Sequence, residues 1–419
     1  MRLVMCHNYY QRRGGEDQSF EDEARLLEDH GHEVIRYTLH NDLLKDRNKF
    51  DVAWRTLWNP TTRRELRSLL RRVRPHIVHF TNSFPSISPS AYFAARAEGI
   101  PILQSLRNFR LLCPQGHFLR DHKVCESCLT KSIKWPSVVH GCYRGSRAGS
   151  FVVSSMIAAH RLIRTWDRVI DRYYCASRFT RQKFIDGGFP AERIGFKPNF
   201  VYPDPGIGQG RGGYAIFAAR LSPEKGLETL INAWKLLEHP IPLKIAGDGP
   251  LADVARDAAR TNPNIEWLGF VPLNRLMPLI GEASVMIVPS TWYETFGRTI
   301  IEAYATGTPV IATRMGAMAE LIDDGRTGYL FDRDDAAGLA VRVKELLSDP
   351  IRLGHMRTNA RAKFEAGFTP AANYRHFETL LHETLAAGPN RRSQMNSPEA
   401  RAAPSARPVP IAAANCEVV

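Results

Sequence analysis

The sequence predicts an α/β protein made of two parallel-sheet domains joined by a short linker. The chain has 419 residues, which is enough for two ordinary hydrophobic cores. Short apolar segments alternate with helical stretches, a rhythm that is typical of parallel sheets covered by helices on both faces. A stretch of prolines and glycines near residue 205 interrupts this rhythm, which then starts again.

The first predicted domain spans residues 1–201, and we expect it to be Rossmann-like. Its apolar first strand leads to a helix that ends at the glycine preceding the next strand. Residues 113–150 carry cysteines and turn residues, so we interpret them as an insertion. In chain order the expected elements are strand 3–6, helix 17–30, helix 60–74, strand 76–80, helix 90–98 and strand 100–104.

Residues 202–213 are the predicted linker, because their two prolines and five glycines suit neither a helix nor a strand. After the linker, strand 214–218, helix 227–237 and strand 243–246 open a second Rossmann-like domain, expected to extend to residue 370. A helix at 371–387 is expected to pack back toward the N-terminal domain. Residues 388–419 are rich in Pro, Ala, Arg and Ser and predict a disordered tail.

The net charge of +13 is concentrated in the N-terminal half of the chain. Residues 1–200 hold roughly 33 Lys and Arg against 19 Asp and Glu, or about +14. Such a half attracts nucleic acid, an acidic membrane surface or a phosphorylated substrate, and a solvated surface is the alternative. The sequence contains no run of eighteen apolar residues and opens like a first strand, not a signal peptide. We therefore expect a cytoplasmic protein.

Two cations stand at a predicted strand end in the second domain. Arg220 follows strand 214–218, and Lys225 comes five residues later, just before a helix. Open α/β sheets bind ligands at the carboxyl ends of their strands, and helix N-termini favour anions. Two cations at such a place suit a diphosphate. For this segment alone, surface charges on a connecting loop are an equally good interpretation.

Two carboxylates, Glu294 and Glu302, lie eight positions apart across a predicted strand-to-helix turn. Eight helical residues rise about 12 Å, which exceeds the roughly 5 to 9.5 Å between paired glycosidase carboxylates. That span suits a grip on the two ends of an extended nucleotide sugar. The backbone amides of Phe296 and Gly297, at the helix start, would then face phosphate or sugar oxygens. The alternative is a pair of ordinary helix carboxylates.

Five segments carry a family resemblance, in this order: Gly14-Gly15-Glu16, Arg220 with Lys225-Gly226, Gly247-Asp248-Gly249-Pro250, Glu294 to Glu302, and residues 307–312 with Gly316 and Glu320. Together they resemble the family 4 glycosyltransferases of the GT-B fold over roughly residues 1–385. The resemblance implies two Rossmann-like domains that face a central cleft, transfer with retention of anomeric configuration, and no catalytic metal.

The resemblance also implies roles for single residues. Arg220 and Lys225 would bind the donor pyrophosphate and stabilise the leaving nucleoside diphosphate. Gly15 would let the first N-terminal loop approach the phosphates without a Cβ. Catalytic roles fall to Arg220, Lys225 and Glu294. Donor binding falls to Gly15, Arg220, Lys225, Phe270 and Val271 (nucleobase), Glu294 (sugar hydroxyls), Phe296, Gly297 and Glu302 (ribose).

The acceptor side departs from the family pattern at two places. Many relatives have a His after an N-terminal strand where this chain has Arg107, and many have a His-x-His-Asn segment where this chain has His79-Phe80-Thr81-Asn82. Arg107 would supply positive charge near the reaction centre, but it is not an acid or base at neutral pH. His79 is either an acceptor-side residue or a core histidine at a strand end.

Four of the seven cysteines cluster within the predicted insertion: Cys113, Cys125, Cys128 and Cys142. A close pair with two further cysteines has the spacing of a structural zinc site with four thiolate ligands. Unpaired buried thiols and a disulfide pair are the alternatives. The stretch 108–114 within this region resembles a branch of bacterial polysaccharide-assembly transferases.

The sequence as a whole favours a membrane-associated, retaining glycosyltransferase at the inner face of the cell membrane. It would move sugar from a nucleotide-diphosphate sugar to a saccharide acceptor that is lipid-linked or on the cell surface. The alternatives are a GT-B phosphorylase or epimerase, and a zinc-dependent nucleic-acid-binding protein. The latter predicts interleaved aromatic and basic residues and no donor constellation, so we expect no nucleic-acid partner.

Overall fold

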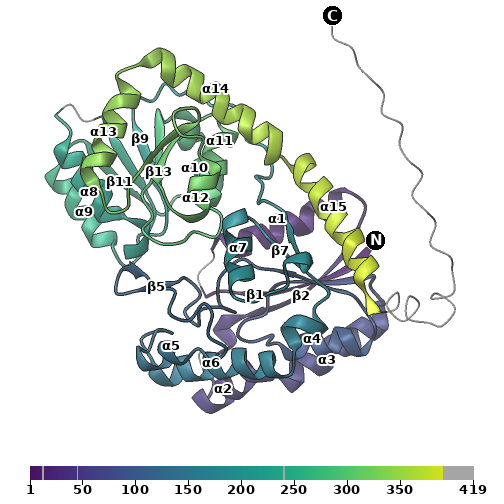
Figure 1. Ribbon diagram of the computed structural model, residues 1–419. Helices are drawn as coiled ribbons and strands as arrows, with labels where there is room; N and C mark the ends of the chain where they lie inside the picture. The colour runs from purple at the N-terminus through teal and green to yellow at the C-terminus, as the bar shows by residue number, and fades with distance from the viewer. Residues whose placement is uncertain (12–13, 45, 239–240, 390–419) are drawn as a thin grey trace, which may run out of the picture.

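The computed structural model describes residues 1–11, 14–44, 46–238 and 241–389. Its described residues form two six-stranded sheets whose strand pairs are all parallel, with helices on both faces of each (Figure 1). The strand orders are β2-β1-β3-β4-β7-β8 and β11-β10-β9-β12-β13-β14. The predicted α/β class with two Rossmann-like domains is confirmed.

The N-terminal domain contains the first sheet and a small hairpin from the cysteine-rich stretch. Its elements are β1 (Arg2–Tyr9), α1 (Gly15–Asp29), β2 (Glu33–His40), η1 (Asn41–Leu44), α2 (Lys49–Leu57), α3 (Pro60–Val73), β3 (Ile77–Asn82), α4 (Ser90–Ala97), β4 (Ile102–Ser105), β5 (Leu119–Arg120), β6 (Lys123–Val124), α5 (Trp135–Val139), α6 (Arg147–Leu162), η2 (Thr165–Val169), β7 (Arg172–Cys175), α7 (Arg178–Asp186), η3 (Ala191–Arg193) and β8 (Ile194–Phe196).

The C-terminal domain contains the second sheet, and the chain then ends its described part in two long helices. These elements are β9 (Ala215–Ala218), η4 (Pro223–Lys225), α8 (Leu227–Leu236), β10 (Leu243–Ala246), α9 (Ala252–Thr261), β11 (Ile265–Gly269), α10 (Leu273–Glu282), β12 (Val285–Val288), α11 (Arg298–Ala305), β13 (Val310–Thr313), α12 (Gly316–Leu321), β14 (Gly328–Phe331), α13 (Ala336–Leu347), α14 (Pro350–Gly367) and α15 (Pro370–Ala387).

Strand β1 shows why an unbroken apolar run forms a central strand. Successive side chains of a strand point to opposite faces, so both faces of β1 must be covered. Leu3 and Met5 pack into the core beneath α1 and α15, whereas Val4 and Cys6 pack into the core on the other face with α3 and α4. All four side chains are fully buried. This double cover fixes the sheet between two helical layers.

The apolar stripe of α3 packs into the core of the N-terminal domain. Leu66 and Leu70 are buried, and Leu69 and Val73 are partly buried against the same core. The positions recur every three or four residues, which is the spacing of one helix face. The stripe therefore belongs to the core, and the arginines of α3 lie on its other faces.

The chain crosses between the domains twice. The segment 202–213 lies against the C-terminal domain, where the Gly208 amide donates to the Thr306 carbonyl. Later, α14 packs on α11 and α13, and α15 returns to the N-terminal domain and packs on α1, β3, β4 and β7 (Figure 1). We retain the predicted domain limits as a proposal. The tail predicted at 388–419 lies, from residue 390 onward, outside the described residues.

Within the described part of the chain, no helix combines the length and the apolar character needed to cross a bilayer.

Candidate active site

The loops that follow β9 and β12 meet at the carboxyl end of the C-terminal sheet. The first loop ends at Gly226, whose φ of +74° lies in the left-handed region. A Cβ on Gly226 would lie 1.9 Å from the carbonyl oxygen of Pro289, the residue directly after β12. Glycine is therefore required for the loops to pack this closely. This packing brings together the side chains of Lys225 and Glu294.

Glu294 accepts three hydrogen bonds on one carboxylate oxygen, Oε1. Nζ of Lys225 lies 2.5 Å away, Nε1 of Trp292 2.9 Å and the Ser290 hydroxyl 3.0 Å. Burial raises the pKa of the Glu294 carboxyl, but the charge of Lys225 and these donors outweigh burial and hold the pKa below its usual range. Glu294 is therefore ionised at neutral pH and forms an ion pair with Lys225.

His117, from the N-terminal insertion, lies beside this pair. Its ring meets the ring of Trp292 edge-on, with centroids 4.5 Å apart, and the Lys225 ammonium lies 5.1 Å from the Trp292 ring centre. Burial, together with the charge of Arg110, lowers the pKa of His117 to about 4, so its imidazole is neutral at pH 7. Sequence reasoning missed His117, because the contact joins two domains and no local motif marks it.

Three further predicted residues lie along the same end of the sheet. Arg220 follows β9 and is exposed. Phe270 follows β11 with 77% of its surface exposed, and Val271 beside it packs partly against the C-terminal core. An aromatic ring left in solvent at the carboxyl end of a parallel strand is free to stack on a planar ligand.

The segment 290–297 is a loop, so the helical spacing considered for Glu294 and Glu302 does not apply. Helix α11 starts at Arg298, after Gly297 turns the chain with a φ of +90°. The Phe296 side chain is buried in the C-terminal core, with its ring centroid 6.1 Å from that of Phe368. What Phe296 and Gly297 offer a ligand is therefore their backbone.

Glu302 is buried on α11, and its side chain is paired across the domain boundary through Arg298. Nε of Arg298 donates to Glu302 at 2.8 Å, and Nη2 donates to Asp22 of α1 at 2.6 Å. Burial lowers the pKa of Arg298, but the charges of Glu302 and Asp22 outweigh burial and raise the pKa above its ordinary value. Sequence reasoning missed Arg298 and Asp22, although Arg298 lies inside the quoted 294–302 segment.

Gly15 begins α1 on the N-terminal side of the site. A Cβ at this position would meet no atom within 4 Å. The neighbouring Glu16 accepts hydrogen bonds from the Tyr10 hydroxyl and the Asn108 side chain, each at 2.9 Å. The start of α1 thus leaves open space at Gly15 and fixes the loop after β4 through Asn108.

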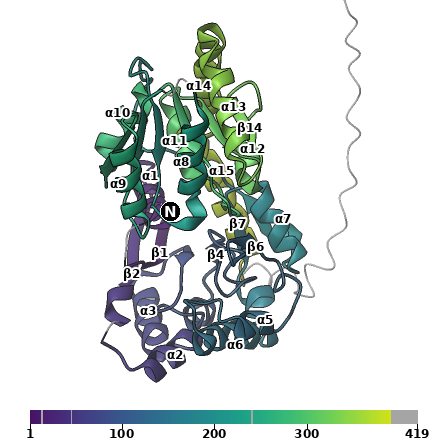
Figure 2. The ribbon, with the colours of Figure 1, turned by 90° about the vertical axis from the view of Figure 1, so that its left-hand side faces the viewer.

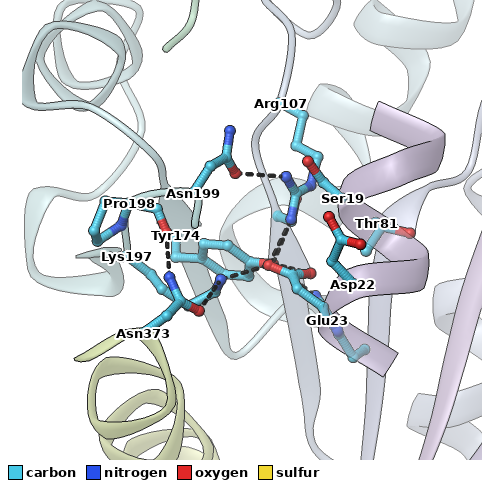
Figure 3. Close-up of polar contacts among 12 residues, drawn as sticks. Ser19, Asp22, Glu23, Thr81, Arg107, Tyr174, Lys197, Pro198, Asn199 and Asn373 are labelled. Atoms are coloured by element: carbon cyan, nitrogen blue, oxygen red, sulfur yellow. Dashed lines mark hydrogen bonds and ion pairs between the residues drawn. The ribbon is translucent and has the colours of Figure 1, made fainter. Parts of the chain in front are cut away.

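Arg107 lies in a buried charged cluster of the N-terminal domain with Glu23 and Lys197 (Figure 3). His79 is buried beside this cluster. Arg107 and Lys197 approach the same oxygen of Glu23, at 2.6 and 2.5 Å. Burial raises the pKa of Glu23, but the two cations outweigh it and hold the pKa at about 2. His79 Nε2 lies 3.1 Å from the Tyr174 hydroxyl, and burial lowers the His79 pKa to about 3. Glu23 therefore neutralises Arg107, and His79 is fully buried.

A small cavity of about 50 Å³ opens beside this cluster, at the carboxyl end of the N-terminal sheet. Asn82 and Arg110 are among its polar walls, and the Arg110 guanidinium lies over the ring of Phe84 at 4.3 Å. Met156 of α6 and Trp166 of η2 contribute apolar walls. Amide and guanidinium donors above apolar side chains suit a polyhydroxylated ligand that has an apolar part.

The four cysteines of the insertion line one small cavity together. All described cysteines are free thiols. Burial raises the pKa of Cys128 to about 11, with a contribution from Cys113. Among the described residues, no group of three or more His, Cys, Asp and Glu side chains has an arrangement that could hold a metal ion. The cysteines therefore surround a common space without converging on one point.

Two family models match the chain in succession. Residues 13–204 match the model "Glycosyltransferase Family 4", and residues 209–363 match "Glycosyl transferases group 1". The chain is 32% identical to a glycogen synthase of Mycobacterium tuberculosis over 159 residues, which are 36% of this chain and 38% of the synthase. It is 30% identical over 210 residues to a GDP-mannose-dependent alpha-(1-6)-phosphatidylinositol monomannoside mannosyltransferase of Mycolicibacterium smegmatis, covering 44% of this chain and 55% of the relative.

The whole chain shares its fold with solved glycosyltransferases. The crystal structure of Alr3699/HepE from Anabaena, in complex with UDP, superposes with a TM-score of 0.64 at 18% identity, covering 91% of this chain and 99% of that one. The chain spans less than two thirds of either sequence relative, so those matches describe its domains and not a whole relative. The chain belongs to the family 4-like glycosyltransferases of the GT-B fold.

Proposed function

We propose that this protein transfers a sugar, with retention of anomeric configuration, from a nucleotide-diphosphate sugar to a lipid-linked saccharide. The reaction would take place at the cytoplasmic face of the cell membrane, in cell-surface polysaccharide biosynthesis. The observation that carries the proposal is the Lys225–Glu294 pair at the carboxyl end of the C-terminal sheet, with Arg220 on the same edge.

This pair has the chemistry to exchange partners for a donor. Lys225 and Glu294 are only partly exposed, at 22% and 14% of their side-chain surface. A donor diphosphate would replace Glu294 as the partner of Lys225, and sugar hydroxyls would replace Lys225 as donors to Glu294. Each group then keeps a strong charge-assisted hydrogen bond, so the exchange costs little. Arg220 and Lys225 would also stabilise the negative charge that develops on the leaving nucleoside diphosphate.

The remaining donor contacts follow from the position of each group. Phe270 would stack on the nucleobase beside Val271, and Glu302 would accept from the ribose hydroxyls. The backbone of Phe296 and Gly297 would face phosphate or sugar oxygens at the start of α11. Gly15 would give the phosphates room on the N-terminal side. No step here calls for a metal, because two cationic side chains supply the positive charge.

The acceptor would bind at the mouth of the small cavity beside Asn82 and Arg110. Its apolar walls, Met156 and Trp166, favour an acceptor with an apolar portion next to its sugar. The mannosyltransferase of Mycolicibacterium smegmatis, by its name, acts on a phosphatidylinositol monomannoside. This supports a lipid-linked acceptor here. Arg107 would act through its place in the cavity wall, as a positioning residue held by Glu23.

A thermal-shift screen of UDP-, GDP- and ADP-sugars tests the proposal, because a ligand that binds the folded state raises the melting temperature. We expect one nucleotide class to stabilise the protein, and proton NMR of the transfer product to show the anomeric configuration of the donor. A phosphorylase would instead respond to inorganic phosphate and a sugar phosphate, and an epimerase would convert the donor without an acceptor. No shift with any nucleotide sugar would contradict the proposal.

We also propose that a structural zinc ion binds Cys113, Cys125, Cys128 and Cys142. The support is their common cavity, in a stretch whose regular structure is a hairpin of two-residue strands and the five-residue helix α5. Tetrahedral thiolate ligation would supply folding energy for this stretch. Elemental analysis of protein purified without metal-affinity resin should give about one zinc per chain. Cys125→Ser should lose it and Cys175→Ser, at a buried thiol elsewhere, should not. Well under one zinc per chain would contradict the proposal.

A further inference from the structure

Three neighbouring helices of the N-terminal domain carry large apolar side chains in solvent. They are α2, α5 and α6, which lie at the end of the domain away from the C-terminal domain (Figures 1 and 2). Phe50 is 85% exposed and Leu162 is 84% exposed. We call the following set the exposed apolar surface: Phe50, Trp54, Ile133, Trp135, Val139, Phe151, Leu162 and Ile163.

The spacing of these residues places them on one face of each helix. Phe50 and Trp54 are four residues apart on α2, as are Trp135 and Val139 on α5, so each pair is adjacent on its helix. Phe151 and Leu162 are eleven residues apart on α6. Eleven residues make three full helical turns plus about 20°, so the two residues lie on the same helix face. Isolated exposed apolar residues are ordinary, but three adjacent helices that each present such a stripe are not.

Direct contacts hold the three helices together. The Ser137 hydroxyl of α5 lies 2.9 Å from that of Ser154 on α6, and His160 of α6 bonds to the Leu57 carbonyl of α2 at 3.0 Å. Helix α6 therefore contacts both of the others. The surface is a fixed part of the domain, so presenting it requires no rearrangement.

Along α5 and α6 the charges are of one sign, whereas on α2 the carboxylate of Asp51 pairs with Arg47 and Arg55. Residues 127–166, which include α5 and α6, contain no Asp or Glu. They contain six cations, of which Lys134 is buried and five lie toward solvent: Lys131, Arg144, Arg147, Arg161 and Arg164. The Lys131 ammonium lies 5.7 Å from the ring centre of Trp135, which pairs a cation with an interfacial aromatic residue. Exposed aromatic and aliphatic side chains edged by cations are typical of surfaces that insert shallowly into anionic bilayers.

We propose that the exposed apolar surface of α2, α5 and α6 docks this protein on an anionic phospholipid bilayer. This deepens the proposed function, because it says how the enzyme would meet a lipid-linked acceptor. An alternative membrane contact would use the six arginines on and directly after α3, which are Arg63, Arg64, Arg67, Arg71, Arg72 and Arg74. Arg67 and Arg71 share Glu98, and Arg63 lies 5.6 Å from the ring centre of Trp58, so three of those six cations already have partners.

The same helix that carries part of this surface also lines the acceptor cavity. Met156 of α6 is a cavity wall, whereas Phe151 and Leu162 of that helix face solvent. Docking through α6 therefore brings the cavity to within about one helix diameter, roughly 10 Å, of the lipid surface. A saccharide attached to a membrane lipid would reach the cavity while its lipid stays in the bilayer.

Sedimentation with vesicles tests the docking surface in the full chain. The probe is vesicles of phosphatidylglycerol mixed with phosphatidylcholine, compared with vesicles of phosphatidylcholine alone. The test variant combines Phe50→Ser, Trp54→Ser, Phe151→Ser and Leu162→Ser. The control variant combines Val341→Ser and Ile351→Ser, which are exposed apolar residues of the C-terminal domain. Sedimentation velocity without vesicles reports the oligomeric state of each protein.

We expect wild type and control to prefer the anionic vesicles, and the test variant to lose at least about tenfold in vesicle partition. The test variant should keep its melting temperature and its thermal shift with the nucleotide sugar. Equal partition of test and control variants would overturn the proposal. So would a wild-type dimer that the test variant breaks while vesicle binding persists, because a second copy would then cover the surface. Failure of nucleotide binding with intact vesicle binding would contradict only the proposed function.

Discussion

The two domains use charged side chains in opposite ways. At the carboxyl end of the C-terminal sheet, Lys225 and Glu294 pair at 2.5 Å and stay partly open to solvent. In the N-terminal domain, Arg107 and Lys197 meet Glu23 at similar distances, but each of the three side chains is at most 7% exposed. Distance is therefore not what separates them. Access to an incoming ligand separates a binding pair from a structural cluster.

Burial also fixes how each group of charges responds to the loss of one member. A partly exposed charge left without a partner is solvated by water, whereas a buried one is not. The N-terminal cluster carries two cations against one carboxylate, so Glu23 is its only compensating charge among these three residues. Substitutions in this cluster should act on stability, and substitutions in the Lys225–Glu294 pair should act on donor binding and catalysis.

The largest effect is expected for Glu23→Gln. The substitution keeps the size of the side chain but leaves Arg107 and Lys197 buried without an anion, which should cost about 3–5 kcal/mol of unfolding free energy. Urea denaturation at pH 7 measures it. Glu28→Gln, at a more exposed carboxylate of the same helix, is the matched control and should cost under about 1 kcal/mol. Similar losses of unfolding free energy in Glu23→Gln and Glu28→Gln would contradict the claim that the buried cluster acts on stability.

Glu294→Ala should act on the reaction and leave the fold intact. It removes the acceptor for the donor-sugar hydroxyls, and a hydrogen bond to a charged group contributes about 1.5–3 kcal/mol, so kcat/KM should fall roughly 10- to 100-fold. Glu266→Ala removes the carboxylate of an exposed Lys–Glu pair on the same domain and should change nothing measurable. A wild-type kcat/KM in Glu294→Ala would show that the Lys225–Glu294 pair is not part of the donor site.

His79 should make stability depend on pH below neutrality. Its pKa falls from 6.5 to about 3 on folding. The unfolded chain therefore binds a proton below pH 6.5 that the folded chain refuses until about pH 3. Stability from this group is fully present above pH 6.5 and is lost at up to about 1.4 kcal/mol per pH unit as pH falls. Urea denaturation at pH 7 and pH 5 should show a smaller loss in His79→Gln than in wild type. Equal losses would mean that His79 titrates normally.

The smallest effect is expected for His117→Ala. The edge-on contact with Trp292 positions the indole that donates to Glu294, and such an aromatic pair contributes about 0.5–1.5 kcal/mol, so kcat/KM should fall roughly two- to tenfold. His122→Ala, at an exposed position of the same insertion, should match wild type. If both variants match wild type, the insertion is not part of the donor site.

The same contrast explains how far the sequence predicts the structure. The C-terminal site was predictable because Arg220, Lys225 and Glu294 each follow a strand of one sheet, and the ends of parallel strands meet. The fold was predictable for a related reason, since alternating apolar strands and helices leave few arrangements. Helix α3 was predicted within one residue of its observed end at Val73.

The contacts that the sequence did not predict all join distant segments. Glu23 of α1 reaches Arg107 in the loop after β4 and Lys197 directly after β8, and His117 reaches Trp292 from the other domain. No local periodicity encodes such contacts, because they depend on how the two sheets face one another. Burial also decided the environment of His79, which strand position alone left open.

Titration calorimetry of Lys225→Met tests the central claim most directly, with the nucleotide sugar that stabilises the wild type as ligand. The claim is that the carboxyl end of the C-terminal sheet binds the donor diphosphate. Lys235→Met, at an exposed lysine near the end of α8, is the matched control. We expect Lys225→Met to raise Kd roughly tenfold or more at an unchanged melting temperature, and Lys235→Met to bind as wild type does. A wild-type Kd in folded Lys225→Met would contradict the account.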